Sequence, residues 1–324
     1  MSGTPRVSPA LLNAFLLLSF AIYGGVTLTI LAQVLPGLFL LEMIASFLPH
    51  ILVFGVIISF LMAYYDRKVA AAGAVLTLIA ALPFVTFSKS VTPSGADCGE
   101  SECLTVITAN VFGKSDAMVA LLELSAREQA DVVAINESIN LILEPEYRPA
   151  FDRYEHLIHA AWENMPSHMG NAITLATDQP VAFQDRVLRR DTGRRAYILA
   201  DLDGAWAGTR LIAAHAMTPV SPMGLETRNA LLDAAGRAAQ EAESFILMGD
   251  FNLTPWTPTF RKLPGQRAGD PRISRTWPVP LGPFGIPIDH IMFSDDLELV
   301  ETRVLEPIGS DHYPVLAKFK RKDR

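Results

Sequence analysis

The first 88 residues of this 324-residue chain carry almost no charge, and this limits the possible folds more than any other feature. Three long apolar runs lie there, at 11–31, 47–65 and 69–87, and the second is interrupted only by Pro49 and His50. About 20 apolar residues are enough for a helix to cross a bilayer. No small-residue cleavage site follows the first run, so we expect a retained anchor rather than a removed signal peptide. Residues 1–88 are therefore predicted to be a membrane anchor with three transmembrane helices; two spans is the alternative.

The segment 38–48, between the first two runs, is too short to span a bilayer and contains Glu42. It predicts either a helix lying at the membrane interface or the bent start of the second span.

Basic residues set the expected orientation of the anchor. Arg6 precedes the first run, Arg67 and Lys68 separate the second and third, and the connection between the first two has no Lys or Arg. The positive-inside rule places the N-terminus and the Arg67 loop in the cytoplasm. With three spans, everything after Lys89 lies on the periplasmic or extracellular side of the cytoplasmic membrane. With two spans it lies in the cytoplasm.

The two cysteines, Cys98 and Cys103, lie in a linker that we place at 89–103. Two cysteines so close together outside an apolar run suggest a disulfide, which persists in oxidising compartments and agrees with the outward location. Two free thiols, or half of a metal site, are the other interpretations.

Residues 104–324 have the composition of a soluble domain. From Lys89 onward there are 24 basic and 32 acidic residues, a net charge of about −8 that disfavours a non-specific polyanion binder. Apolar runs predict strands, and 3.6-residue periodicity predicts helices with Ser115 as one N-cap. The expected strands are 104–109, 132–135, 172–176, 197–202, 210–214, 245–248, 288–293, 299–305 and 315–319. The expected helices are 115–129, 226–243 and a short one at 256–262, followed by a Pro/Gly-rich loop at 264–287.

Polar side chains follow several of these strands. Asp250 and Asn252 come after the buried run at 245–248, where Gly249 is expected to let the backbone turn. Being two apart, they face the same way if the strand geometry persists. An Asp-x-Asn sequence is more often a satisfied turn, so the signal lies in the whole set. That set is Asn110, Glu137, His215, Asp250, Asn252, Asp289, Asp311 and His312.

Three motifs carry a family resemblance: Gly-Asp-Phe-Asn at 249–252, Ile-Asp-His-Ile at 288–291 and Ser-Asp-His-Tyr-Pro-Val at 310–315. In this order they resemble the endonuclease/exonuclease/phosphatase family, to which pancreatic deoxyribonuclease and bacterial sphingomyelinases belong. The resemblance covers about 104–320. It implies an α/β (α+β) four-layer αββα sandwich of two packed β-sheets, preceded here by the transmembrane helices.

The resemblance also implies metal-assisted attack of water on a phosphoester. Hard oxygen ligands suit Mg²⁺ or Mn²⁺. The expected metal residues are Asn110, Glu137 and Asp311. The expected catalytic residues are His215 as a donor to a phosphate oxygen, Asp250 for the attacking water, Asn252 for the phosphate, and His312 with Asp289 fixing its tautomer. His290 should face away and be structural.

Two departures from the family pattern bear on the substrate. Asn136 stands where many members have Gln, and the DNA-gripping Arg or Tyr has no match near 169–171, where His168 and Asn171 are weak candidates for a phosphate-side role. We expect a membrane-anchored phosphodiesterase or phosphatase acting on a lipid or another membrane-proximal phosphoester. The bilayer is then a partner, and the loop aromatics Trp256, Phe260, Trp277 and Phe284 are candidate lipid contacts beside an ordinary packing role.

Two alternatives remain open. A membrane-anchored nuclease, for which nucleic acid is disfavoured by the acidic domain, predicts a basic rim from Arg189, Arg190, Arg194, Arg195 and Arg210. A catalytically inactive binding module is the other.

Overall fold

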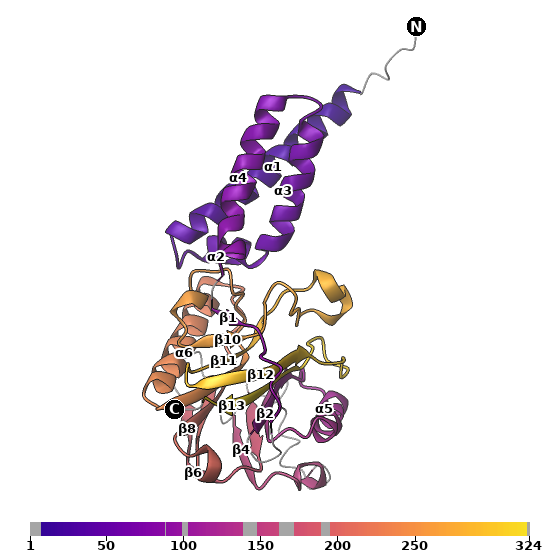
Figure 1. The fold of residues 1–324 in the computed structure, drawn as a ribbon. Helices are drawn as coiled ribbons and strands as arrows, with labels where there is room; N and C mark the ends of the chain where they lie inside the picture. Colours follow the sequence, from indigo (N-terminus) through magenta and orange to yellow (C-terminus); the bar gives the residue numbers. More distant parts are fainter. Residues whose placement is uncertain are drawn as a thin grey trace. The chain divides into compact units, whose positions relative to one another are not determined.

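The computed structural model describes residues 8–87, 89–98, 103–138, 148–161, 172–188 and 195–322. The chain divides into two compact units: a helical unit of 1–87 with 256–258, and an α/β unit of 88–255 with 259–324. Figure 1 shows the elements of both.

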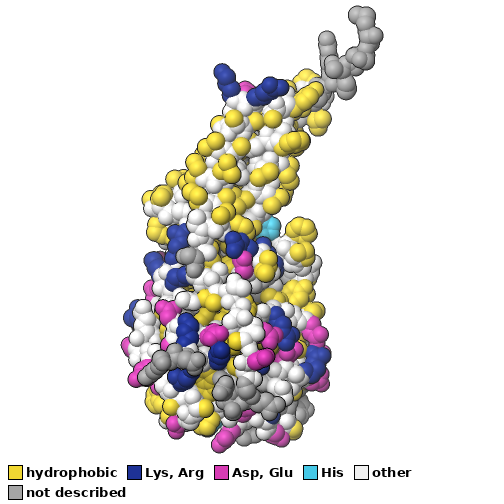
Figure 2. All heavy atoms as spheres, in the orientation of Figure 1, with side chains coloured by type: hydrophobic (Ala, Val, Ile, Leu, Met, Phe, Trp, Pro, Cys, Tyr) yellow, Lys and Arg dark blue, Asp and Glu magenta, His cyan; other side chains and the backbone are white. Residues whose placement is uncertain are grey.

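The helical unit contains α1 (Pro9–Val34), α2 (Phe39–Ser46), α3 (Leu48–Met62) and α4 (Arg67–Val85). α1 and α4 are each long and apolar enough to cross a membrane; α2 and α3, bent by 73°, make a third candidate if the pair is one span. The segment around Glu42 is therefore a separate short helix at the start of a bent pair. Apolar side chains cover the outside of the unit (Figure 2), and Phe20 and Phe60 are each 80% exposed. Hydrocarbon would solvate such a surface.

Small residues let the helices of this unit approach closely. A Cβ on Gly73 would lie 2.1 Å from the ring of Tyr23, and one on Gly55 would lie 2.7 Å from Thr77 Oγ1. The Tyr23 hydroxyl is 3.1 Å from Ser59 Oγ, so these polar groups satisfy each other inside the unit. Close packing of small residues with hydrogen bonds between helices is how membrane helices associate.

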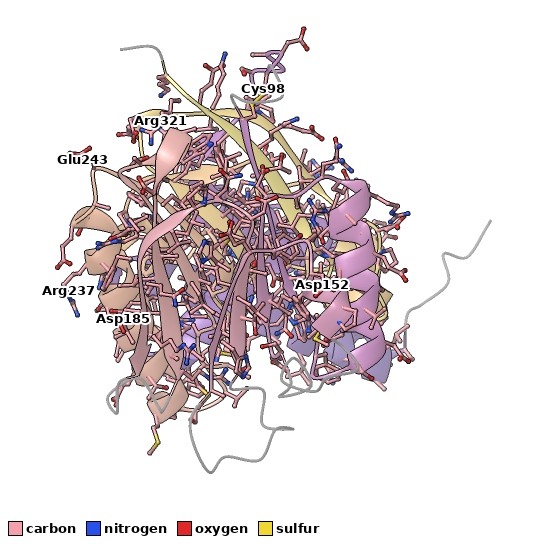
Figure 3. All side chains as sticks on the ribbon, turned by 90° about the horizontal axis from the view of Figure 1, so that it is seen from below. Cys98, Asp152, Asp185, Arg237, Glu243 and Arg321 are labelled. Carbon is pink, nitrogen blue, oxygen red and sulfur yellow. A yellow bond between two sulfur atoms is a disulfide. The ribbon has the colours of Figure 1, made fainter. Side chains whose placement is uncertain are left out.

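The α/β unit is built on two mixed sheets. The first has the order β1 (Ser90–Val91), β10 (Gln266–Ala268), β11 (Asp289–Phe293), β9 (Ser244–Asp250), β8 (Thr209–Ala214), β7 (Ala196–Leu202), β6 (Val181–Leu188). The second has the order β12 (Leu297–Val304), β13 (Val315–Arg321), β2 (Cys103–Asn110), β3 (Val132–Asn136), β5 (Ile173–Thr177), β4 (His156–Ala160). Two of the parallel pairs, β2–β3 and β8–β9, are joined through helices α5 (Ser115–Arg127) and α6 (Pro222–Gln240). These helices lie on opposite outer sides (Figure 3).

The core lies between the sheets and is filled from alternate strand positions. Leu104 and Val106 of β2 meet Ile246 and Met248 of β9 in one apolar cluster, as period-two alternation requires. The intervening residues, such as Ile107 and Val133, form a second cluster under α5. The predicted αββα sandwich is thus confirmed, and Arg237 and Glu243 lie at its periphery near α6 (Figure 3).

The sequence predictions differ from the structure in several elements. α5 has Lys114, not Ser115, at its N-cap, because Ser115 already has helical geometry. α6 begins four residues earlier than predicted, where Ser221 Oγ accepts the Gly224 N–H (3.0 Å) ahead of Pro222. The expected helix at 256–262 is only a 3-10 turn, η5 (Phe260–Lys262), and the loop at 264–287 contains β10 and the 3-10 turn η6 (Val279–Phe284). Strands β1, β4, β6 and β10 were not predicted from the sequence.

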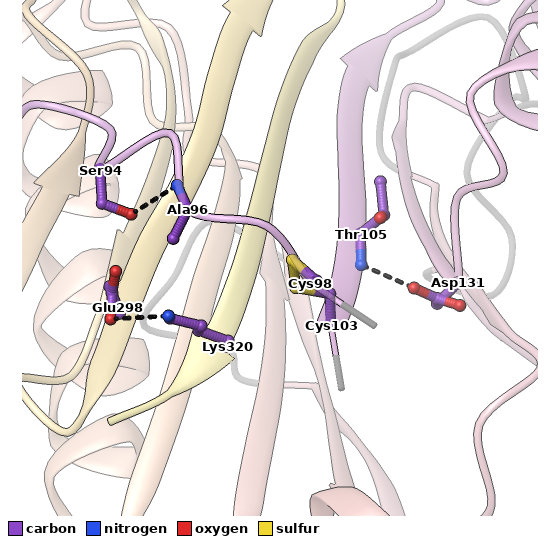
Figure 4. The surroundings of a disulfide bond; sticks show 8 residues. All are labelled: Ser94, Ala96, Cys98, Cys103, Thr105, Asp131, Glu298 and Lys320. Atoms are coloured by element: carbon purple, nitrogen blue, oxygen red, sulfur yellow. Dashed lines mark hydrogen bonds and ion pairs between the residues drawn. A yellow bond between two sulfur atoms is a disulfide. The ribbon is translucent and has the colours of Figure 1, made fainter. Parts of the chain in front are cut away.

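The linker before β2 contains a disulfide between Cys98 and Cys103 (Figure 4). Cys103 is the first residue of β2, so the bridge attaches the incoming chain to a central strand of the second sheet.

Candidate active site

The polar side chains that follow the strands continue the inward-facing alternation of the core. Asp250 follows Met248 by two residues on β9, and Asp289 precedes Ile291 by two on β11, where it is the cross-strand partner of Asp250. Asn110 on β2 and His215 just after β8 are two or four residues beyond inward-facing positions. Because the parity is the same on each strand, these side chains meet between the two sheets at one end of the sandwich.

Asn110 links two carboxylates across the sheets. Its Nδ2 donates to Glu137 Oε1 (3.1 Å) and to Asp250 Oδ2 (3.1 Å), and its Oδ1 accepts the Phe112 N–H (2.8 Å). Asn110 and Asp250 are buried, whereas Glu137 has 21% of its side chain exposed. The amide therefore holds a buried and a partly open carboxylate in fixed positions.

His215 lies beside the same two carboxylates, with Nε2 3.6 Å from Glu137 Oε1 and 3.8 Å from Asp250 Oδ2. The buried Arg195 reaches it from the residue just before β7, with Nη1 2.8 Å from His215 Nδ1. Sequence reasoning considered Arg195 only for a nucleic-acid rim. Its place in the site follows from the antiparallel register, which puts Tyr197 opposite Ala214 and hence the start of β7 beside the end of β8.

Asp289 and His312 form a buried pair, with Asp289 Oδ2 2.9 Å from His312 Nδ1. His312 Nε2 points toward the carboxylates and lies 3.9 Å from Asp250 Oδ2. Burial alone would lower the pKa of His312, but the negative charge and hydrogen bond of Asp289, with Asp250 behind them, raise it to about 10. His312 is thus a protonated donor whose Nε2 faces the Asp250 carboxylate.

The terminal motif is fixed to β2 by its serine. Ser310 Oγ donates to the Asn110 carbonyl (2.7 Å) and accepts the His312 N–H (3.2 Å). Asp311 points differently: its Oδ2 accepts Trp277 Nε1–H (2.9 Å), and its carbonyl accepts the Val279 N–H (2.8 Å). Asp311 therefore connects the site to the loop that carries η6.

Asn252 reaches the site by a turn and not by continued strand geometry, since β9 ends at Asp250 and Asn252 has a φ of 47°. The Asp250 carboxylate accepts the Asn252 N–H (2.9 Å), and Asn252 Nδ2 donates to the Ala216 carbonyl (3.0 Å). From α6, the buried Arg228 donates from Nη1 to the Asn252 carbonyl (3.2 Å).

Gly249 acts by close approach and not by turning the chain. It lies within β9, and a Cβ there would be 1.9 Å from the Ala214 carbonyl oxygen of β8. Only glycine lets the two strands meet beside His215 and Asp250.

Residues with a strained backbone gather around the catalytic cluster. Of the four non-glycine residues with positive φ in the described chain, three are Phe112, Glu137 and Asn252, and the fourth is Gln129 on α5's C-terminal side. Such conformations cost of order 1–3 kcal/mol each and persist where the surroundings enforce them.

A scan against protein-family models matches residues 107–312 to the "Endonuclease/Exonuclease/phosphatase family". The chain belongs to the endonuclease/exonuclease/phosphatase family. Among solved structures, the fold is similar to an endonuclease/exonuclease/phosphatase from Beutenbergia cavernae (TM-score 0.56, 18% identity, covering 68% of this chain and 72% of that one). It is also similar to one from Bacteroides vulgatus (0.57, 15%, 68% and 99%) and to D. rerio TDP2 complexed with single-strand DNA product (0.55, 15%, 67% and 99%). No curated protein has a matching sequence.

The side-chain oxygen atoms of this site suit a divalent cation. Burial raises the pKa of Glu137, and burial together with the charge of Asp289 raises the pKa of Asp250 to about 7. Two desolvated carboxylates held together by one amide present hard oxygen atoms that a cation would stabilise in the ionised form. Asp250, Asp289 and His312 also offer ligand atoms within 4.8 Å of one another. That closeness arises largely from the Asp289–His312 hydrogen bond, which already uses His312 Nδ1.

His290 lies on the face of β11 opposite to Asp289, away from the catalytic residues. It is fully buried, its Nδ1 accepts Arg267 Nε–H (2.9 Å), and its Nε2–H donates to the Leu253 carbonyl (2.7 Å). Burial first, and the Arg267 charge second, hold the pKa of His290 well below its ordinary value, so it is neutral.

Several other expected positions do not reach the pocket or lie outside the described residues. Trp256 and Phe260 are buried (2% and 0% exposed), so they do not offer surface to lipid. Arg210 pairs with Asp201 (2.6 Å) toward the start of β8, away from His215. His168, Asn171, Arg189, Arg190 and Arg194 lie outside the described residues.

Proposed function

We propose that this protein is a membrane-anchored, divalent-metal-dependent phosphoester hydrolase whose catalytic unit lies outside the cytoplasm. The observation that carries the proposal is the cluster of polar side chains between the sheets, where Glu137, Asp250 and His312 come together from segments far apart in the chain. Two carboxylates and a protonated imidazole lie together here, largely shielded from water, and each is held in place by a hydrogen bond to another side chain. Such fixed charges suit the hydrolysis of an anionic ester.

The metal is assigned to Glu137, with Asn110 and Asp311 near it. When bound, Mg²⁺ or Mn²⁺ supplies positive charge to the phosphoryl oxygens and the leaving oxygen. Asn110 Oδ1 keeps a second lone pair beyond its bond to Phe112, so it can serve as a ligand without losing that bond.

The other residues hold the ester and move protons. Asp250 orients the attacking water and accepts its proton, which a pKa raised toward neutrality favours. Protonated His312, held by Asp289, donates from Nε2 to a phosphoryl oxygen. His215 and Asn252 bind further phosphoryl oxygens, and Arg195 adds its charge behind His215.

A lipid, or another phosphoester met at a membrane, is the proposed substrate class. On η6, Leu281 and Phe284 are 53% and 71% exposed, and Phe112 beside Asn110 is 52% exposed. Trp277 Nε1–H bonds Asp311, so this apolar loop is connected to the pocket. Exposed apolar side chains near a cluster of polar side chains suit a substrate with an apolar part.

Three spans, with α2 and α3 as one bent span, put the α/β unit on the outer side under the positive-inside rule. The Cys98–Cys103 disulfide supports the same location, because disulfides persist outside the cytoplasm.

The test uses the purified full chain in detergent with a phospholipid, a nucleotide, single-strand DNA and duplex DNA, with Mg²⁺ and with EDTA. Asp250→Ala and His312→Ala should each lower phospholipid turnover by about 10²-fold or more. His156→Gln is the matched control, because His156 lies at the end of β4 away from the pocket and should keep full activity. Turnover of DNA alone would support the nuclease alternative, and retained activity in both alanine variants would show that the site is assigned wrongly.

A further inference from the structure

Two apolar grooves flank the C-terminal end of α3 in the helical unit. One, of about 470 Å³, lies between α3 and α4, and the other, of about 840 Å³, lies between α1 and α3. Phe60 and Ala63 line both, so α3 forms a ridge between them. Both volumes fall in the range of about 300–1,000 Å³ that is typical of small-molecule sites.

The first groove exists because α4 presents small side chains there. Ala70, Ala71 and Ala74 line it, and Thr77 near its far end already donates its hydroxyl to the Gly73 carbonyl (2.8 Å). The walls therefore offer almost no unsatisfied polar group to water and suit a hydrocarbon chain. Along α4 the groove runs from Arg67 to Leu78, which is about 16 Å of helix. That is close to half of the roughly 30 Å hydrocarbon core, the depth of one leaflet.

The same groove carries a cation at one end. Arg67 lines it, Lys68 follows, and both side chains are exposed. Neither side chain has a hydrogen bond or ion pair within the described chain. Asp66 is occupied as the N-cap of α4, accepting the Lys68 and Val69 N–H groups (2.8 and 3.2 Å). Figure 2 shows Lys and Arg side chains gathered at one end of the helical unit, next to a largely apolar surface.

The second groove has an aromatic end at the same level. Tyr64 and Tyr65 line it, and the Tyr65 ring packs on Phe15 of α1 with centroids 5.0 Å apart. Tyrosines of this kind mark the headgroup level of a bilayer.

We propose that this end of the helical unit is a specific binding site for an anionic diacyl phospholipid. Its phosphate contacts Arg67 and Lys68, one acyl chain lies in the α3–α4 groove, and the other lies in the α1–α3 groove across the Phe60–Ala63 ridge. A second copy of the chain suits the groove less well, because a partner helix would cover the Arg67 guanidinium without supplying an anion. A phospholipid supplies apolar chains and negative charge together.

The site is tested by native mass spectrometry of the full chain released from nanodiscs made of equal parts phosphatidylglycerol and phosphatidylcholine. Lipid retained on the protein should be enriched about tenfold or more in phosphatidylglycerol. Arg67→Gln with Lys68→Gln should remove the enrichment, and Arg67→Lys with Lys68→Arg should keep it. Ala71→Leu should also remove it by filling the groove, whereas Ala72→Leu, one position along α4 and outside the groove, should not.

Each other result overturns the site. Equal retention of the two lipids would mean an ordinary lipid annulus. Enrichment that survives Ala71→Leu would mean attraction of headgroups to surface charge without a groove. A dimer that loses its contact in Ala71→Leu would mean that a second copy occupies the groove. Because Ala71→Leu leaves the charge unchanged, it separates the groove from any effect of Arg67 and Lys68 on topology.

Discussion

Asp131 is a largely buried carboxylate just before β3, away from the catalytic residues. Its Oδ2 accepts the Thr105 N–H of β2 (2.6 Å; Figure 4). Burial raises the pKa of Asp131 to about 6 despite that bond, and Asp178 adds to the increase. Since the folded pKa exceeds the unfolded value, the contribution to stability is fully present below about pH 4 and is lost as the pH rises through about 6.

We therefore predict that Asp131→Asn stabilises the α/β unit near neutral pH and not in acid. Asparagine keeps an oxygen for the Thr105 N–H without the buried charge. Raising the pKa of Asp131 from 3.8 to about 6 on folding corresponds to about 3 kcal/mol of unfolding free energy, which solvent screening reduces to about 1 kcal/mol. Melting curves in detergent should show the variant about 2–4 °C higher at pH 7.5 and equal to the wild type at about pH 3.5. A gain of the same size at both values would contradict the assignment to ionisation.

Gly249→Ala should damage both fold and site, because its Cβ would meet the Ala214 carbonyl at 1.9 Å. We expect a loss of more than about 2 kcal/mol in unfolding free energy, with most of the activity. Gly204→Ala is the comparison: its φ is also positive, at 61° against 142° for Gly249, but only Pro180 Cγ lies near its Cβ, at 3.7 Å. Equal losses in the two variants would mean that backbone conformation alone, and not strand approach, explains Gly249.

The site residues illustrate how far a sequence predicts a pocket. Asn110, Asp250 and Asp289 were predicted because each continues a visible apolar strand, and parity then brings them together. Arg195 was not, since its approach to His215 depends on the β7–β8 register, which no local pattern encodes.

At the scale of elements, strands were predicted best in the middle of the sheets. β2, β3 and β9 are buried on both faces and read as continuous apolar runs. β4 and β6 are edge strands, and β6 in particular (Val-Ala-Phe-Gln-Asp-Arg-Val-Leu) mixes exposed polar residues with apolar ones. An edge strand pairs with a neighbour on one side only and often carries charged or polar residues on its open side. Its sequence therefore does not stand out as a continuous apolar run.

The η6 turn offers a prediction at the same scale. Changing Leu281 and Phe284 to serine should raise KM for a phospholipid substrate while leaving turnover of a water-soluble phosphoester unchanged. Both side chains are largely exposed, so stability should change by no more than about 0.5 kcal/mol. Ile273→Ser, which removes an 81% exposed side chain outside η6, controls for general loss of surface hydrophobicity. If KM rises for both substrates alike, η6 shapes the pocket and does not contact lipid.

At the scale of the molecule, the distribution of charged residues along the sequence marks the same boundary between two units that the structure shows. Five charged residues before Lys89 predicted an apolar helical unit, and α1 and α4 confirm helices able to span a membrane. The number of spans did not follow from hydropathy alone, because the 73° bend between α2 and α3 leaves 15 residues in α3.

Topology is the last prediction, and single cysteines in a background with Cys98 and Cys103 changed to serine test it. With three spans, Lys322→Cys lies outside and should react with a membrane-impermeant maleimide in intact spheroplasts. Tyr64→Cys, 83% exposed next to the Arg67 loop, should react only after lysis. Two spans, α1 and α4, would reverse both results, because α1 would then carry the Arg67 loop to the outside and α4 would return the α/β unit to the cytoplasm. The wild-type cysteines give an independent measurement. If Cys98 and Cys103 are oxidised, they resist alkylation in cell extracts until a reductant is added. A reduced pair would contradict the outward location even if the labelling agreed with it.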